Sequence, residues 1–141
     1  MPDYAPHGNY EIWLDPEQDR VIRIAASGFV NLEMLRLHNH RANEIVEGFK
    51  GGPYAMICNF NGGMVMTPEA EDAWITSAVG RVARGLVGVS FFFDSEAEFK
   101  TLVLAQVTRV LDAIGVPWQE VENEDEAMIK ALEFLEQTSS S

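Results

Sequence analysis

The stretch YAMICNFNGGMVMTPEAEDAW, residues 54–74, decides the fold. Its first seven residues are nearly all apolar, as expected of a β-strand that is covered on both faces of a sheet. Helix-start signals follow, because Thr67 can cap a helix and Pro68 suits its first position. A covered strand that leads into a helix is typical of a parallel α/β sheet.

The same alternation recurs along the rest of the chain. Residues 86–93, LVGVSFFF, form another apolar run, and Ser95 with Glu98 makes a capping box that would open the next helix. Asn31 and Asn123 are the expected first residues of two more helices. The predicted strands lie at 10–15, 20–28, 54–60, 86–93 and 118–121, and the predicted helices at 31–49, 68–84, 96–114 and 123–135.

A hairpin precedes this alternating part. YEIWLD and RVIRIAASG flank the polar turn PEQD, and two such runs around a short turn indicate an antiparallel pair. The later strands, each separated by a helix, are expected to pair in parallel. The sequence therefore predicts an α/β fold with a mixed β-sheet and the order β-β-α-β-α-β-α-β-α. One domain would cover 10–136, between a flexible segment at 1–9 and a polar tail at 137–141.

The charge balance narrows the classes of function. The chain has 141 residues, of which 22 are acidic and 10 basic, so its net charge is −12. This sign repels phosphate backbones and anionic lipids, which argues against nucleic-acid binding and electrostatic membrane binding. The single cysteine, Cys58, lies in an apolar run and is interpreted as a buried, reduced thiol. No signal peptide or membrane-length apolar run is recognisable, so we expect a cytoplasmic protein.

Three stretches carry a resemblance to a known family. VIRIAASGFVNLEMLRLH resembles the second strand, glycine turn and first helix of the STAS domain, the fold of the SpoIIAA-like anti-sigma factor antagonists and of sulfate-transporter tails. YAMICNF resembles its central strand, and VGVSFFF with WQEVENEDEAMIKAL resembles its closing strands and last helix. The resemblance covers nearly the whole chain, through pattern and order rather than one sharp motif.

The resemblance implies a regulatory domain that binds other proteins. In that family a serine in an Asp-Ser-Ser-Gly-like context, at the start of the helix after the central strand, is phosphorylated as a switch. Here the stretch reads NFNGGMVMTPEAED, and Thr67 is the one hydroxyl near the helix start. The chain is thus more similar to the bacterial SpoIIAA-like branch without the switch serine, a branch also similar to the lipid-binding CRAL-TRIO fold. We expect no regulatory phosphorylation at Thr67.

The segment before that helix is the strongest candidate site for a ligand or partner. A loop at the end of a central strand is where open α/β sheets bind ligands. The methionines would suit an adaptable surface, or they would fold back onto the core. The glycines fit a turn, no P-loop motif is present, and Thr67 fits a helix cap. The candidate residues are Asn61, Gly62, Gly63, Met64, Met66 and Thr67.

Other polar groups do not form a recognisable catalytic or metal site. His38 and His40 are two positions apart on a helix and point to different faces, so they cannot share a metal directly. His38 is expected to be partly buried at the edge of the core. The acidic run at 120–126 lacks the spacing of a calcium loop and is interpreted as a solvated edge with favourable helix-dipole charges. The sequence predicts no cofactor and no metal.

The helix at 96–114 has an apolar arc wider than one sheet face requires. Leu104 and Leu111 extend this arc, and a final helix, a dimer partner or an apolar ligand would have to cover them. They are therefore candidate homodimer interface residues.

The expected function is a non-enzymatic, cytoplasmic regulatory or protein-interaction domain of the STAS type, without the phosphoserine switch and with an unidentified protein partner. The alternative is a small carrier that binds a lipid or another apolar molecule between helices and sheet. An enzyme with an unfamiliar site ranks last.

Overall fold

The computed structural model describes residues 9–93 and 100–139, and within these ranges the side chains of 9, 29, 61–65, 100 and 138–139 lie outside the description. The predicted order of elements is confirmed. The strands are β1 (Asn9–Leu14), β2 (Val21–Val30), β3 (Tyr54–Met66), β4 (Leu86–Phe93) and β5 (Trp118–Glu120). The helices are α1 (Leu32–Glu47), α2 (Pro68–Ala83), α3 (Lys100–Ile114) and α4 (Glu124–Ser139).

The five strands form one mixed sheet in the order β1-β2-β3-β4-β5. β1 and β2 pair antiparallel, as the hairpin predicts, and the other neighbouring strands pair in parallel. Each crossover therefore steps to the next strand in the same direction. Because such crossovers share one handedness, they place their helices on the same face of the sheet.

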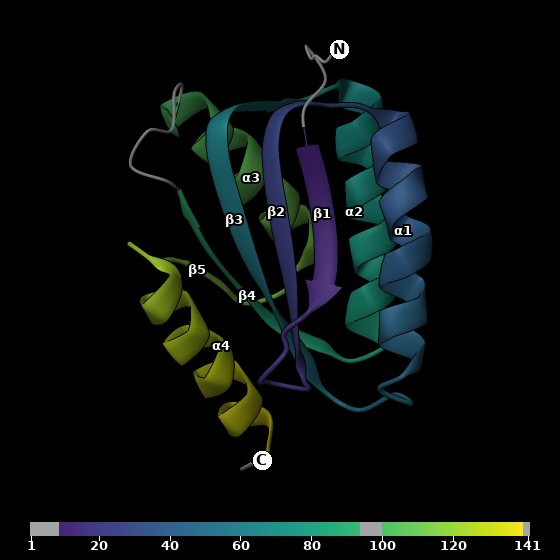
Figure 1. Ribbon diagram of the computed structural model, residues 1–141, viewed down its shortest axis with the longest axis vertical. Helices are drawn as coiled ribbons and strands as arrows, with labels where there is room; N and C mark the ends of the chain where they lie inside the picture. Colours follow the sequence, from purple (N-terminus) through teal and green to yellow (C-terminus); the bar gives the residue numbers. More distant parts are fainter. Residues whose placement is uncertain (1–8, 94–99, 140–141) are drawn as a thin grey trace.

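The helices divide unequally between the two faces. The larger core joins residues of α1, α2 and α3 to one face, whereas the smaller core joins α4 to the other. Figure 1 shows α4 apart from α1 and α2, on the opposite side of the sheet. α4 contacts β3 and β4. In the described part of the chain, one helix thus covers one half of the second face.

The larger core is built on aromatic and branched side chains that alternate along the strands. Phe60, Phe91 and Phe93 lie with ring centroids about 6 Å apart, and Trp74 of α2 packs edge-on against Phe60. The predicted caps also form, because the side chains of Asn31 and Thr67 accept hydrogen bonds from the backbones of their helices.

The largest differences from the predicted boundaries are in β2, β3 and α4. β3 does not end at Phe60 but continues through Met66, beside a β2 that extends to Val30. The register shifts between Ser27 and Phe29, and Gly28 between them has a φ of 68°, which glycine adopts without steric cost. α4 continues to Ser139 rather than ending at Leu135, because no glycine or proline follows to stop it. The expected capping box at Ser95 and Glu98 lies outside the described residues.

Candidate functional site

The half of the second sheet face that no described helix covers carries two rows of side chains across neighbouring strands. The first row runs from Trp13 to Arg23 and on to Ile57, which are paired in register. The second row includes Asn59 of β3, paired with Phe92 of β4. Since alternate residues of a strand share a face, all these side chains project from the side that α4 covers only in part.

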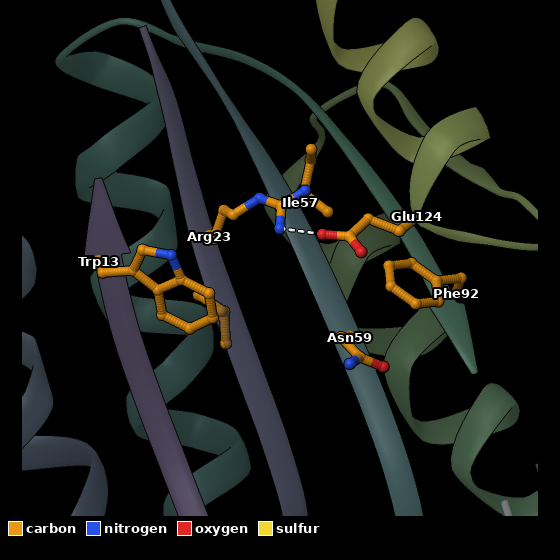
Figure 2. A pocket seen from close by; sticks show the side chains of 7 residues that line it. Trp13, Arg23, Ile57, Asn59, Phe92 and Glu124 are labelled. Atoms are coloured by element: carbon orange, nitrogen blue, oxygen red, sulfur yellow. Dashed lines mark hydrogen bonds and ion pairs between the residues drawn. The ribbon is translucent and has the colours of Figure 1, made fainter. Parts of the chain in front are cut away.

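Arg23 connects this surface to the start of α4. Its Nη1 donates a hydrogen bond to Oε1 of Glu124, the first residue of the helix, and Figure 2 shows the side chain reaching across to that carboxylate. Its Nε lies 3.0 Å from Oδ2 of Asp15, but it has no aligned hydrogen-bond partner, so this contact is an ion pair. Asp15 Oδ1 also accepts hydrogen bonds from the backbone N–H groups of Glu17 and Gln18. Arg23 therefore joins the hairpin turn to α4.

Two adjoining hollows lie around this ion pair, and we call them together the β1–α4 groove. The inner hollow has a volume of about 250 Å³ and the outer one about 430 Å³. Trp13, Arg23 and Glu124 line both. The other residues are Ile24, Ile57, Asn59 and Phe92 in the inner hollow and Asp15, Pro16, Glu17, Gln18, Asp125 and Met128 in the outer one.

The inner hollow combines flat apolar walls with an unpaired acceptor. Trp13 and Phe92 present aromatic rings from β1 and β4 (Figure 2). Asn59 Oδ1 is buried and has no hydrogen-bond partner among the described residues. A buried acceptor without a partner costs stability, and a ligand that brings a donor would recover it. Binding sites typically combine such apolar walls with a few polar groups.

The segment that the sequence singled out lies elsewhere, at the carboxyl end of β3. Asn61, Gly62, Gly63 and Met64 continue this strand rather than forming a loop, and the described side chains do not include theirs. Met66 is buried in the core, which agrees with the alternative that the methionines fold back onto the core. Gln106 of α3 holds Met66 with both groups of its amide, because it accepts from the Met66 N–H at 3.4 Å and donates to its carbonyl at 3.2 Å.

Thr67 acts as the cap that the sequence predicts. Its Oγ1 accepts a hydrogen bond of 3.1 Å from the backbone N–H of Ala70. We expect Thr67→Ala to lower the free energy of unfolding by about 1 kcal/mol, measured by urea denaturation, because the first turn of α2 loses this acceptor. Thr76→Ala, at an exposed position in the interior of α2, is the matched control and should not lower the free energy of unfolding. Equal effects of the two changes would contradict a capping role.

Leu111 does not need a second chain to cover it. Leu111 is 2% exposed within the single chain, and Leu104 is half-buried against the same core. The idea that α4 covers them is wrong, because α4 lies on the other face of the sheet, whereas α3 contacts α2 and β3. A homodimer through α3 stays a proposal, because Leu104 is half-buried and Leu102 of the same helix is 63% exposed.

The buried ionisable groups are far from reactive. Burial raises the pKa of the Cys58 thiol to about 12, so the thiolate is scarce at neutral pH. Burial also raises the pKa of Tyr54 to about 12. Arg81 of α2 is 2% exposed and donates from Nη2 to Asn39 Oδ1 at 2.8 Å, which links it to α1. We interpret this cluster as structural.

His38 is half-buried, as predicted, and lies with its ring centroid 5.2 Å from that of Tyr10. Burial lowers the pKa of its imidazole. Among the described residues, no group of three or more histidine, cysteine, aspartate or glutamate side chains is placed to hold a metal ion.

Comparisons with known proteins give no family assignment. The chain matches no family model, no curated protein and no solved structure. Within residues 9–93 and 100–139, no helix combines the length and the apolar character needed to cross a membrane.

The sequence contained signals for the groove that the site prediction missed. Arg23 interrupts the apolar run VIRIAA, and Asn59 interrupts YAMICNF. A polar residue within such a run indicates either a partner across the sheet or an uncovered face. Glu124 belonged to the acidic run interpreted as a solvated edge, but its carboxylate binds Arg23.

Proposed function

We propose that this chain is a non-enzymatic, cytoplasmic binding domain of the STAS-like, SpoIIAA-like type, and that it engages a protein partner through the β1–α4 groove. The observation that supports the proposal is the uncovered half of the second sheet face, with Trp13 beside Arg23 at its centre. A large aromatic ring in a concave surface is typical of the residues that contribute most to protein interfaces. Arg23 supports this surface by pairing with Asp15 and Glu124.

The proposed role does not require the switch serine of the family. The partner would bind a preformed surface, because Arg23 and Glu124 already fix α4 relative to the hairpin. The site at residues 61–67 remains a second proposed contact, at the opposite end of β3 from Tyr54.

The alternative function, a small carrier that binds a lipid or another apolar molecule between helices and sheet, has weaker support. On the side of α1–α3, the cavity beside Tyr10, Phe60 and Trp74 has a volume of about 10 Å³, roughly the space of one water molecule. A lipid would have to open the core to enter there. Mass spectrometry of molecules that co-purify with the chain tests this alternative, which predicts a retained lipid in near-equal amount.

Affinity capture with matched variants tests the proposed function. We expect wild type and Leu37→Ala to recover the same partner, because Leu37 is 73% exposed on α1, which packs on the face of the sheet opposite to the groove. We expect Trp13→Ala, checked for folding by circular dichroism, to lose that partner. Recovery that depends on Leu37 and not on Trp13 would contradict the assignment of the groove.

A further inference from the structure

Most of the charged side chains that line the β1–α4 groove, in the described part of the chain, are acidic. Asp15, Glu17, Glu124 and Asp125 supply four carboxylates, and Arg23 supplies one guanidinium. Arg23 is paired with Asp15 and Glu124, so these three side chains retain one net negative charge, and Glu17 and Asp125 add two more. A groove of this kind attracts cations and repels anions.

The uncharged groups in the groove favour the same kind of ligand. The indole of Trp13 can accept a cation over its face, and this interaction is stronger with Trp than with the other aromatic rings. Asn59 Oδ1 requires a donor. Lysine and arginine side chains bring several N–H donors and no acceptor. One such group can therefore lie over the indole ring of Trp13 and also donate a hydrogen bond to the amide oxygen of Asn59.

The shape of the groove favours a chain over a small free cation. The inner hollow lies beside the Arg23–Glu124 ion pair, and the outer hollow continues from there along the hairpin turn at Pro16 to Met128 of α4. If one side chain of a bound peptide lies in the inner hollow, the adjacent residues of that peptide lie in the outer hollow. There they are next to the exposed carboxylates of Glu17 and Asp125. The net charge of −12 would also speed the encounter with a basic partner.

We propose that the β1–α4 groove binds a lysine- or arginine-containing peptide segment of a partner protein, which rests on the function proposed above. One basic side chain enters the inner hollow between Trp13 and Glu124, and the amide of Asn59 turns toward the hollow so that Oδ1 accepts a hydrogen bond from it. Adjacent basic residues pair with the carboxylates of the outer hollow. Complementary charge then selects basic segments and rejects acidic ones.

The test is fluorescence anisotropy at physiological ionic strength with three probes: a labelled peptide of alternating lysine and glycine, its glutamate counterpart, and spermidine as a competitor. We expect the lysine peptide to bind wild type and the glutamate peptide not to bind. The charge-reversed variant Glu124→Lys/Asp125→Lys should weaken binding about tenfold or more. The milder variant Glu124→Gln/Asp125→Asn, which keeps the size of both side chains, should weaken binding in the same direction.

The control carries the same change of net charge on the same helix. Glu133→Lys/Glu136→Lys alters two exposed positions of α4 that do not line the groove, so we expect less than about a twofold change in affinity. Equal weakening by both reversed variants would overturn the proposal, because it would show attraction to the overall charge. Absent binding of the lysine peptide, or equal binding of the glutamate peptide, would overturn it as well.

Three further outcomes separate failure of the peptide proposal from failure of the proposed function. If spermidine binds and the lysine peptide does not, the groove is a small-cation site and the peptide proposal fails. If no basic probe binds but partner capture still depends on Trp13, the proposed function stands and the basic partner is excluded. If the lysine peptide binds through Glu124 while capture is independent of Trp13, the proposed function fails instead.

Discussion

Gly88→Ala is expected to destabilise the fold by roughly 1–3 kcal/mol, because it adds a methyl group where α4 packs on the sheet. A Cβ at Gly88 would lie 2.3 Å from Cγ of Phe134 and 2.4 Å and 2.7 Å from its two Cδ atoms, so the ring or the whole helix has to shift. α4 approaches β4 closely elsewhere too, since Ser90 Oγ donates to the carbonyl of Ala127 at 2.8 Å. Urea denaturation measures the loss of stability.

Gly80→Ala is the matched control for this prediction. Gly80 is exposed in the interior of α2, and nothing lies within 4 Å of the position of an added Cβ. Alanine should therefore stabilise the chain by about 0.5–1 kcal/mol, because glycine is the poorer helix former. A Gly88→Ala variant that is as stable as wild type would contradict the close packing of α4 on β4. It would also mean that α4, which forms one wall of the β1–α4 groove, does not lie where the structure places it.

Leu111→Ala is expected to cost about 2–5 kcal/mol, because a fully buried leucine leaves a cavity that its neighbours fill only in part. Leu102→Ala, on the same helix but 63% exposed, should change the free energy of unfolding by less than about 0.5 kcal/mol. Denaturant unfolding of both variants measures the difference. A small effect at Leu111 would mean that α3 is not packed as described.

Light scattering complements this pair of variants. We expect Leu111→Ala to reduce stability without changing the mass of the native species, because the leucine lies inside one chain. A wild-type dimer that Leu111→Ala converts to a folded monomer would contradict its placement in the core. It would restore Leu104 and Leu111 as interface residues.

Local signals explain why the order of elements could be predicted from the sequence. Asn31 and Thr67 mark helix starts through hydrogen bonds within their own first turns, and Gly85 with a φ of 123° marks the end of α2. The polar turn of the hairpin also specified the one antiparallel pair. Each of these signals depends on a few adjacent residues.

The differences arose where distant residues decide the structure. The extension of β3 through Gly62 and Gly63 depends on pairing with β2, and glycine-rich sequence without alternation does not reveal a strand partner. The burial of Leu111 depends on contacts of α3 with α2 and the sheet, which a helical wheel does not show. The width of an apolar arc indicates how much of the helix surface is buried, but it does not identify the element that buries it.

The groove could have been predicted in outline but not in detail. Consecutive crossovers place three of the described helices on one face, so one described helix remains for the other face of the five strands. An uncovered half-face follows from that imbalance. The meeting of Trp13, Asn59 and Glu124 does not, because it depends on the register of three strands and on the position of α4.

An NMR titration that follows each backbone amide tests most directly whether the β1–α4 groove is the binding surface. With the lysine-containing peptide as ligand, we expect the largest shifts at Trp13, Arg23, Asn59 and Glu124, and small shifts along the outer surfaces of α1–α3. The indole N–H of Trp13 should shift while those of Trp74 and Trp118 stay in place. Largest shifts on the outer surfaces of α1–α3, around Leu37 or Val79, would contradict the central claim.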